Sequence, residues 1–527
     1  MKDTQKSSSK IIDESISFAR IHCNDVNVKF RKTKGQFFTP KKIATFMADL
    51  PDINDDTIRI LDPGAGTGIL IAAICDRIIN QKETPCNIFI DAYENDERLV
   101  PLLQNTLEIC KNNLAEKKHK PILKNINSNF ILKKEQEKNR DPSGSKKERS
   151  VEYDLVIANP PYYKINIKAP ESQKLKEYLN GQPNIYPLFM ISAIQSLKEN
   201  GKFIFIIPRS FCSGLYYKKI RDWFVKNTQI NFIHCFESRL KIFEDNVTQE
   251  TVILYGKKTK PEKKQKVNIS ISDDKTFKNT SNFFVPNKIV FETKTSESFI
   301  RIPHSQIDLK IIQEIDTWEN SLSSLGMEIS TGKVVDFRTK ENLIFNLTGN
   351  RGVPLLWMHN LKDGVIDWPS NKYSKTQGIL LNEHTKNQVI PVNNYVLLKR
   401  FTSKNQKRRL YATPLLKTDF QGFSFIGLEN HLNYIYGVEK PISIIDLFGL
   451  TALLNTSFYD AYYRTFGGST QVNANEMRKI SLPNNTKITA IGKLVKEEKN
   501  LLSKELDMKI GKILDFDETL LKIIKQI

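Results

Sequence analysis

The sequence predicts an α/β protein with a doubly wound, mostly parallel sheet, followed by a separate mixed α+β domain and C-terminal helices. Three observations carry this prediction. Strand-like apolar runs alternate with helix-like runs over residues 35–256, as a parallel sheet requires. A glycine-rich segment at residues 61–70, LDPGAGTGIL, follows the first strand and opens a helix. After residue 266, β-branched and aromatic runs dominate, which indicates a second domain.

The expected elements follow in chain order. A lead of residues 1–34 contains one helical segment at residues 11–23, and apolar strands are expected at residues 57–60, 87–93, 151–158, 203–207, 231–236 and 251–255, with helices at 185–197 and 217–226. The connection between the last two strands is too short for a helical crossover, so we expect an antiparallel hairpin at the sheet edge. The remaining boundaries are a basic linker at 257–266, a second domain at 267–489 and a helical tail at 490–527.

The glycine-rich segment indicates a binding site for a nucleoside. Gly64, Gly66 and Gly68 lie on the strand-to-helix turn, where a ligand can approach the backbone closely. The dinucleotide fingerprint would need a third glycine where this chain has Ile69. Glu94 ends the next strand, where a carboxylate is suited to bind the two hydroxyls of a ribose. Turn and acid together predict a nucleoside-bearing cofactor.

The segment Asn159, Pro160, Pro161 and Tyr162 indicates the reaction. Two consecutive prolines cannot continue a strand or a helix, so the chain must leave the sheet as a rigid loop. The Asn159 side-chain oxygen and the Pro160 carbonyl can accept the two hydrogens of an exocyclic amine on an aromatic base, and Tyr162 can stack on that base. Alone, the motif also fits a simple strand-ending turn. The preceding glycine turn and Glu94 favour the chemical interpretation.

These motifs occur in an order that resembles a known family. The segments are KGQFFTP (34–40), DPGAGTG (62–68), DAYENDE (91–97), NSNF (127–130), NPPY (159–162), GKFIFIIPRSF (201–211) and IFEDNVTQETVILYG (242–256). They resemble the N6-adenine-specific DNA methyltransferases of the gamma arrangement, with a TaqI-like catalytic domain. A looser similarity to the BsuBI/PstI type of restriction-modification methyltransferase extends through residues 464–483. The resemblance implies a Rossmann-like methyltransferase sheet and a target-recognition domain after it.

The resemblance also implies the cofactor, S-adenosyl-L-methionine, and residues that bind it. Thr39 and the segment Asp62, Pro63, Gly64 would hold its methionine end, Glu94 its ribose, and Asn129 with Phe130 its adenine. The family usually has Asp at the position of Asn129, where the carboxylate accepts a hydrogen from the adenine amine. Asn can still accept through its side-chain oxygen.

For the target base, the resemblance implies that Phe243 sandwiches it against Tyr162, and Asn184 is a further candidate contact. The implied activity is transfer of the methyl group to the N6 amine of adenine within a specific short double-stranded DNA sequence. The base would be flipped out of the duplex. Its nitrogen would attack the methyl group directly, as in the modification enzyme of a type II restriction-modification system.

Composition agrees with a DNA-binding protein. Lys and Arg number 79 against 59 Asp and Glu, a formal charge of +20, which attracts polyanions. The charged runs at 133–150 and 257–266 are best interpreted as a solvated loop and a linker. In the segment 397–414, basic residues alternate with Phe401 and Tyr411, and these are expected phosphate contacts: Lys399, Arg400, Lys404, Lys407, Arg408 and Arg409.

Several classes of protein are not supported. The six cysteines show no C-x-x-C pattern and the seven histidines are scattered, so we expect neither a metal site nor disulfides. No signal sequence and no stretch of about 18 apolar residues occurs, so we expect no membrane contact and a cytoplasmic, nucleoid-associated prokaryotic protein. It is expected to act as a monomer, linked functionally to a cognate restriction endonuclease without necessarily binding it.

Three alternatives remain at this stage. A protein-glutamine methyltransferase also carries NPPY but would leave the second half of the chain without a role. A modification subunit of a multi-subunit restriction system usually has a long helical region before its GQFFTP-like segment, whereas 34 residues precede Gly35 here. The third alternative is a DNA-binding protein whose cofactor-binding fold has no catalytic activity. The intact NPPY segment and the intact glycine turn argue against it. No convincing nuclease pattern is present.

Overall fold

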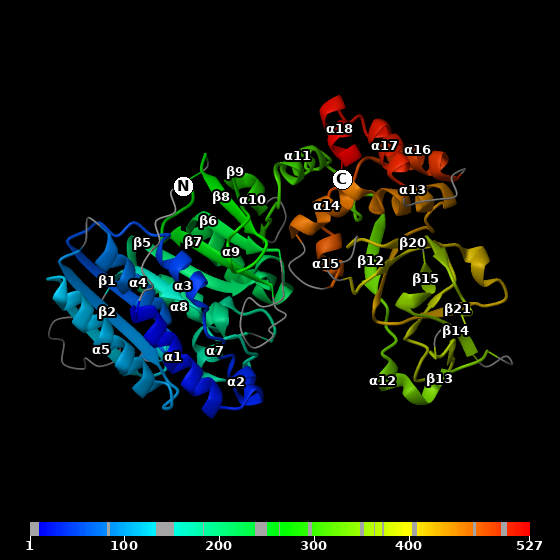
Figure 1. The fold of residues 1–527 in the computed structure, drawn as a ribbon. Helices are drawn as coiled ribbons and strands as arrows, with labels where there is room; N and C mark the ends of the chain where they lie inside the picture. Colours follow the sequence, from blue (N-terminus) through cyan, green and yellow to red (C-terminus); the bar gives the residue numbers. More distant parts are fainter. Residues whose placement is uncertain are drawn as a thin grey trace, which may run out of the picture. The chain divides into compact units, whose positions relative to one another are not determined.

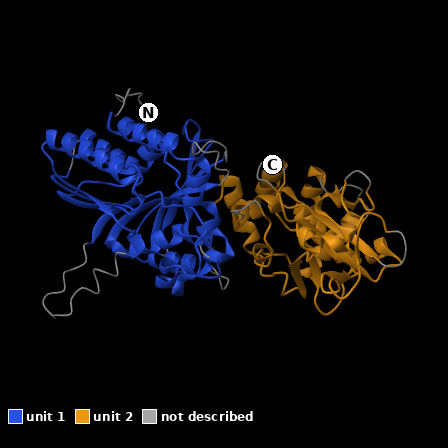
Figure 2. Cartoon of the chain, turned by 90° about the horizontal axis from the view of Figure 1, so that it is seen from below, with its two compact units in different colours: residues 1–301 blue, residues 302–527 orange. Residues whose placement is uncertain are grey.

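The computed structural model forms two compact units, Met1–Arg301 and Ile302–Ile527 (Figure 2). The residues it describes are 10–81, 85–132, 152–182, 184–237, 250–262, 264–292, 298–347, 352–362, 364–370, 374–402, 408–466, 471–496 and 503–526. Phe243, Lys404 and Lys407 lie outside the described residues, as does the charged run 133–150. Each unit is considered by itself below.

Unit 1 is built on a nine-stranded sheet with the order β3-β2-β1-β4-β5-β7-β6-β8-β9. The strands are β1 (Thr57–Asp62), β2 (Asn87–Glu94), β3 (Lys120–Asn127), β4 (Tyr153–Ala158), β5 (Leu197–Pro208), β6 (Gln229–Phe236), β7 (Thr251–Lys257), β8 (Lys266–Ser272) and β9 (Thr280–Pro286). Strands β3, β2, β1, β4 and β5 are parallel, and β7 is antiparallel to both β5 and β6. This confirms the predicted doubly wound, mostly parallel sheet.

Helices cover both faces of this sheet (Figures 1 and 2). They are α1 (Lys10–Asp25), α2 (Val28–Lys34), α3 (Lys41–Ala48), α4 (Ile69–Asn80), α5 (Val100–Glu116), α7 (Pro170–Lys174), α8 (Tyr186–Ser196), α9 (Lys218–Asn227) and α10 (Asn287–Val290), with 3-10 turns at Lys176–Tyr178, Arg209–Cys212 and Leu215–Tyr217. The chain moves one way from β1 to β2 and β3, and the other way from β4 to β5. Right-handed crossovers therefore put α4 and α5 on one face and α8 on the other. The point where the order reverses lies between β1 and β4.

Two boundaries differ from the prediction. The β6–β7 hairpin is antiparallel as predicted but is not at the sheet edge, because β8 pairs in parallel with β6 and β9 pairs with β8. Residues 257–266 thus join two strands of one sheet and do not link two domains. At the other end, α1 packs against α4 and α5, and Ser15 Oγ donates to the Thr67 carbonyl at 3.1 Å, so the N-terminal lead belongs to unit 1. Strand propensity does not reveal which sheet a strand will join, and this explains the error.

Unit 2 is mixed α+β. Its strands are β12 (Met327–Thr331), β13 (Leu343–Ile344), β14 (Gly352–Leu356), β15 (Leu361–Lys362), β16 (Val365–Ile366), β17 (Gly378–Leu380), β18 (Val389–Pro391), β19 (Tyr395–Lys399), β20 (Ala412–Leu415), β21 (Phe425–Leu428) and β22 (Leu432–Gly437). They form sheets ordered β12-β22-β19-β20, β13-β17-β14-β21-β18 and β15-β16. Their apolar faces pack into clusters that include Leu397, Ile426 and Ile379.

The helices of unit 2 flank these sheets (Figure 1). They are α11 (Gln306–Ile315), α12 (Asp336–Thr339), α13 (Ile444–Leu454), α14 (Ser457–Phe466), α15 (Ala474–Met477), α16 (Asn485–Lys496), α17 (Lys504–Ile513) and α18 (Glu518–Gln526). The predicted helical tail corresponds to α16–α18, of which α16 packs closely against α13. Across the described residues of both units, we find no helix that is long and apolar enough to span a membrane.

Candidate active site

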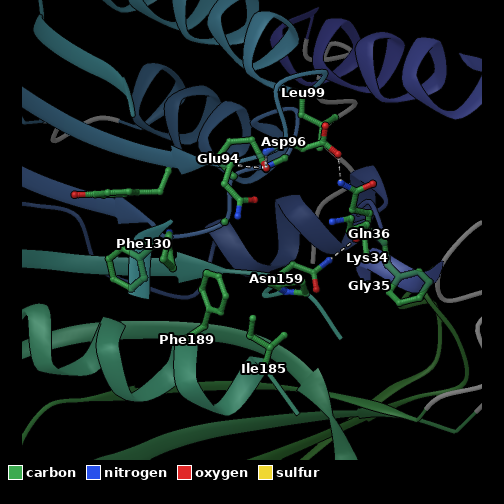
Figure 3. Close-up of a pocket in the computed structure, with 18 of the residues that line it drawn as sticks. Lys34, Gly35, Gln36, Glu94, Asp96, Leu99, Phe130, Asn159, Ile185 and Phe189 are labelled. Atoms are coloured by element: carbon green, nitrogen blue, oxygen red, sulfur yellow. Dashed lines mark hydrogen bonds between the residues drawn. The ribbon is translucent and has the colours of Figure 1, made fainter. Parts of the chain in front are cut away.

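A cavity of about 500 Å³ lies in unit 1 at the carboxyl ends of β1, β2 and β4 (Figure 3). This is where the strand order reverses, and it is where open α/β sheets bind ligands. The volume is within the range of about 300–1,000 Å³ of small-molecule sites. Its lining comes from the β1–α4 turn, the end of β2, the turn after β3, the loop after β4 and the start of α8. Residues far apart in the chain therefore meet around one volume.

Asp62 ends β1 with an unsatisfied carboxylate. Its side chain is 1% exposed, and its Oδ1 accepts the N–H of Gly64 at 3.2 Å. Its Oδ2 has no hydrogen-bond partner among the described residues. Burial raises the pKa of Asp62 to about 7, with the Gly64 N–H opposing that shift and Glu94 adding to it. Asp62 itself is not among the residues that line the cavity, whereas Pro63 and Gly64 beside it are. A buried carboxylate oxygen without a donor is costly, so a donor on a ligand that reached past Gly64 would lower this cost.

The three glycines of the β1–α4 turn serve different purposes. Gly66 and Gly68 have φ of 57° and 85°, a region that side chains disfavour. A Cβ on Gly68 would also lie 2.9 Å from Thr106 Cγ2 on α5, so its role is packing. A Cβ on Gly64 would meet Phe189 and Pro161 at ordinary distances of 3.7 and 3.9 Å. Both neighbours line the cavity, so Gly64 keeps space open for a ligand.

Glu94 ends β2 and lines the cavity beside this turn (Figure 3). Its Oε2 accepts the Gly66 N–H at 2.9 Å, and its Oε1 accepts the N–H groups of Asn95 and Asp96 at 2.8 Å each. Burial raises the pKa of Glu94, and these three N–H groups oppose that shift. A carboxylate offers about four acceptor positions, so Glu94 retains capacity for a further donor such as a ribose hydroxyl.

Asn129 and Phe130 follow β3 and lie next to the end of β2, because the Ser128 N–H donates to the Glu94 carbonyl at 3.1 Å. Asn129 Oδ1 accepts the Leu132 N–H at 3.2 Å, and its Nδ2 donates to Glu171 Oε1 at 2.8 Å. The Phe130 ring lies 6.1 Å from that of Phe189, at 25° between planes. Figure 3 shows these two rings together at one end of the cavity.

Asn159 lies at the other end, next to Gly35 (Figure 3). Its Nδ2 donates to the Phe37 carbonyl at 2.7 Å and to Thr39 Oγ1 at 3.1 Å. These two acceptors fix the amide with its nitrogen toward the GQFFTP segment. The Tyr162 hydroxyl lies 2.7 Å from Asn159 Oδ1 and 2.6 Å from the Ile206 carbonyl. Because a hydroxyl has one hydrogen, it donates to one of these oxygens at a time.

Tyr162 differs from the prediction. It is 7% exposed and, unlike Phe130, is not among the residues that line the cavity, so its ring is not presented there for stacking on a base. Its N–H donates to the Gly35 carbonyl at 3.3 Å, and its ring packs beside Phe37 and Tyr186. Burial raises the pKa of Tyr162 well above its usual value, so the phenol stays neutral. The ring points inward, where Asn159 Oδ1 and the Ile206 carbonyl are acceptors for its hydroxyl. The next residue, Tyr163, lines the cavity instead.

Most predicted residues of unit 1 nevertheless surround one cavity. Those that line it are Thr39, Pro63, Gly64, Gly66, Glu94, Asn129, Phe130, Asn159 and Pro161. Pro160 is buried within the same turn. Asn184 pairs with Lys164 in an isolated bridge next to Ile185, which does line the cavity. Sequence reasoning missed Gln36, Tyr163, Glu171, Ile185 and Phe189, which also line it. Among these, Gln36 lies within the segment KGQFFTP and Tyr163 directly follows NPPY.

The basic segment of unit 2 is described at Lys399, Arg400, Arg408 and Arg409, and one of these four predicted phosphate contacts is contradicted. Arg409 is 1% exposed, and its guanidinium donates to the Thr402 carbonyl at 2.9 Å, so the prediction for this residue is wrong. Arg400 is half-buried and donates to the Asn430 carbonyl at 2.9 Å and to Gln471 Oε1 at 3.1 Å. Lys399 Nζ lies 3.9 Å from the centre of the Tyr411 ring. Arg408 is partly buried. The described residues contain no group of three or more His, Cys, Asp or Glu arranged to hold a metal ion.

Fold and site together define the class: an S-adenosylmethionine-dependent methyltransferase, with a cavity at the switch point of a doubly wound sheet whose β7 is antiparallel. Residues 79–243 match the model of the Eco57I restriction-modification methylase family. The chain is 33% identical to the type II methyltransferase M.PstI of Providencia stuartii, over 88% of this chain and 90% of that protein. It is 32% identical to the type II methyltransferase M.BsuBI of Bacillus subtilis, over 95% of this chain and 98% of that protein. The chain belongs to this family of type II DNA methyltransferases of restriction-modification systems.

Among solved structures, a cryo-EM structure of a DrdV–DNA complex aligns with 92% of this chain and 59% of its own, at 14% identity and a TM-score of 0.45.

Proposed function

We propose that this enzyme methylates the N6 amine of adenine within a specific sequence of double-stranded DNA. The observation that carries the proposal is the orientation of Asn159. Its amide nitrogen is bonded to the Phe37 carbonyl and Thr39, so its oxygen is the accepting end, and beside the Tyr162 hydroxyl it keeps a second acceptor position for a hydrogen of a substrate amine. Adenine N6 and cytosine N4 are both such amines. The resemblance of NPPY and its neighbouring motifs to N6-adenine enzymes favours adenine.

The residues around the cavity fit S-adenosylmethionine. Asp62 has a buried oxygen that needs a donor, which the α-ammonium group of the methionine end supplies. Gly64 leaves room that a side chain would fill. Glu94 retains about one acceptor position for a ribose hydroxyl, and the rings of Phe130 and Phe189 would supply apolar faces for the adenine. Bound there, the cofactor supplies an activated methyl group on a sulfonium.

The chain's own residues then orient the amine. Asn159 Oδ1 and the Pro160 carbonyl accept its two hydrogens, which aligns the nitrogen lone pair and increases its electron density. Transfer would form a nitrogen–carbon bond as the methyl group leaves the sulfonium, and the proton of the methylated amine would pass to solvent, since neither Asn159 nor the Pro160 carbonyl is a base. Tyr162 acts as a positioning residue that holds Asn159, in place of the stacking role expected from the sequence. Phe243, outside the described residues, stays a candidate for stacking.

Reaching this site requires the adenine to leave the duplex, at a cost of a few kcal/mol. Recognition of the DNA sequence is assigned to unit 2, since the similarity to M.PstI and M.BsuBI spans both units. A protein-glutamine methyltransferase would not need that second half. We also propose that the enzyme acts as a monomer on the nucleoid, with a cognate endonuclease as a separate protein. Light scattering of the purified chain tests the oligomeric state.

The deciding experiment uses the purified full-length chain, plasmid DNA and isotopically labelled S-adenosylmethionine. DNA is digested to nucleosides, and the labelled product is identified by mass spectrometry. N6-methyladenine in wild-type reactions and its loss with Asn159→Ala are expected. N4-methylcytosine as the product would contradict the adenine assignment. Long-read sequencing of the methylated plasmid then identifies the recognised sequence.

A further inference from the structure

A carboxylate that no motif pointed to lies at the aromatic end of the cavity. Glu171, the second residue of the short helix α7, lines the cavity together with Asn129, Phe130 and Phe189. Two bonds attach α7 to the turn after β3. Asn129 Nδ2 donates to Glu171 Oε1 at 2.8 Å, and Lys174 Nζ donates to the Ile131 carbonyl at 2.7 Å. The position of Glu171 is therefore set by contacts on both sides of Phe130.

The orientation of the Asn129 amide determines what this pair offers a ligand. Its Oδ1 accepts the N–H of Leu132, in the manner of a residue that caps a helical turn. That N–H is a donor, so the atom facing it must be the amide oxygen, and the nitrogen must face Glu171. Asn129 thus has one backbone donor on its oxygen and the carboxylate on its nitrogen, which leaves its oxygen one further acceptor position. Glu171 has about three acceptor positions left and is the charged acceptor of the pair, so it is the stronger acceptor for a ligand amine.

The groups that line this end of the cavity beside Glu171 are neutral or apolar, and Lys174 of the same helix is bonded to the Ile131 carbonyl. Burial raises the pKa of Tyr163, and the Glu171 carboxylate adds to that shift, so the neighbouring phenol is neutral. The neighbouring rings of Phe130 and Phe189 are apolar. Of the groups described around this end of the cavity, Glu171 is the anionic acceptor beside the aromatic pair. An aromatic ligand could pack against Phe130 and Phe189 and donate a hydrogen from an amine on its edge to Glu171.

We propose that Glu171 recognises the adenine of the cofactor by accepting a hydrogen from its exocyclic amine, while Asn129 holds the carboxylate in position. The inference rests on the proposed function only for the identity of the cofactor. In the family that the sequence resembles, Asp usually occupies the position of Asn129. Here Asn occupies that position and donates to the carboxylate of Glu171, which comes from a different segment.

The test is calorimetric binding of two ligands to the full-length enzyme without DNA. S-adenosylhomocysteine carries the amine, and S-inosylhomocysteine carries a carbonyl oxygen in its place. Wild-type protein is expected to bind the adenosyl ligand at least about tenfold more tightly, because the inosyl oxygen would face a carboxylate. Glu171→Gln should lose about tenfold in affinity for the adenosyl ligand and gain for the inosyl ligand, since its amide can donate to the carbonyl. The matched control is Glu177→Gln, an exposed glutamate of the following turn.

An exchange of the two side chains sharpens the test. Asn129→Asp alone should weaken binding of the adenosyl ligand about tenfold, because it places two carboxylates in contact. Combining Asn129→Asp with Glu171→Gln should restore the affinity to within about threefold of wild type, since a carboxylate and an amide are again paired. Restoration also shows that the single variants did not merely misfold.

The proposal is overturned if Glu171→Gln binds both ligands as wild type does, or if it weakens both equally, which would indicate a purely structural role. It is also overturned if the exchange variant is no better than Asn129→Asp. If wild-type protein binds neither ligand, the cofactor site under the proposed function is itself wrong. That result differs from a wild type that binds the adenosyl ligand without any contribution from Glu171.

Discussion

The cavity of unit 1 and the basic segment of unit 2 were both predicted from short stretches of sequence. They differ in how many of the predicted residues occupy the expected positions in the structure. Around the cavity, residues such as Glu94 and Asn159 lie together as their motifs imply. In the basic segment, Arg409 is buried and Arg400 is bonded to the Asn430 carbonyl within unit 2. One set of predictions concerned backbone turns, and the other concerned net charge.

The difference has a physical cause. A Pro-Pro turn or a glycine at positive φ constrains the backbone locally, so side chains near it have few places to point. A guanidinium has five donors on a long flexible stem, and these bind protein carbonyls as well as phosphates. Charge in a sequence therefore says little about which arginines reach the surface. Substitutions at Asn159, Arg409, Gly64, Gly68 and Asp62 test whether predictions from backbone turns are more reliable than predictions from charge.

The largest effect is expected at Asn159. Asn159→Ala removes an acceptor for the amine, so the rate of methyl transfer should fall by about 10²–10⁴-fold. Affinity for S-adenosylhomocysteine should stay within about threefold. Single-turnover transfer to plasmid DNA and calorimetry measure the two quantities. Asn80→Ala, on the exposed end of α4, is the matched control. Near-normal turnover of Asn159→Ala would remove this residue from the mechanism.

The next effect is on stability and concerns Arg409. Arg409→Ala should lower the free energy of unfolding of unit 2 by about 2–4 kcal/mol, because the carbonyl of Thr402 loses a buried donor. Chemical denaturation followed by tryptophan fluorescence checks this, since unit 2 contains Trp318, Trp357 and Trp368.

The companion measurement is the dependence of DNA binding on salt. A phosphate contact contributes a slope of about one unit, and Arg408→Ala serves as the comparison variant. If Arg409→Ala left the stability unchanged and reduced the slope of DNA affinity against salt by about one, Arg409 would be a phosphate contact as the sequence predicted. The difference between the basic segment and the cavity would then disappear.

Two glycines of one turn should separate ligand binding from folding. Gly64→Ala places a methyl group beside Phe189 and Pro161 without a clash, so affinity for the cofactor should fall about tenfold while thermal stability is retained. Gly68→Ala combines a φ of 85° with a contact of 2.9 Å to Thr106, so it should lose about 1–3 kcal/mol of stability. Differential scanning fluorimetry and calorimetry distinguish the two. Equal behaviour would mean that the turn is only structural.

The last effect is a pH dependence from Asp62, whose pKa burial raises to about 7. The ionised carboxylate pairs with the ammonium group of the cofactor, so affinity should rise with pH through 7 and fall by up to about tenfold per unit below it. The sign for stability is opposite. Because burial disfavours the ionised form, the stability contribution is present below the unfolded pKa of Asp and is lost as pH rises through 7.

Asp62→Asn should flatten the binding profile measured between pH 5.5 and 8.5, a range chosen to span about one and a half units on either side of that pKa. If the variant keeps the wild-type profile, the titrating group is Glu94, whose pKa burial also raises.

Sequence reasoning reached the parallel sheet, the glycine turn and the strand ends that carry Glu94 and Asn159, because each depends on local backbone chemistry. It did not reach Glu171 or Phe189, which come to the cavity from separate helices through tertiary packing. It also misplaced β8 and β9, since their pattern predicts strands and not the sheet they join. Tyr162 shows a third limit. The motif located the residue, but whether its ring faced outward depended on the Ile206 carbonyl.

The bond from Asn159 to the Phe37 carbonyl also bears on errors of substrate choice. An unrestrained amide can rotate by half a turn and present either its oxygen or its nitrogen. Here rotation would set the amide oxygen against the carbonyl oxygen of Phe37, at a separation of 2.7 Å. Under the proposed function, the site therefore favours bases that donate a hydrogen bond to Asn159. Thymine or a deaminated adenine would place a carbonyl oxygen against the amide oxygen of Asn159, and the repulsion would disfavour binding. The loop that contains Phe37 would in this way contribute to selection of the base.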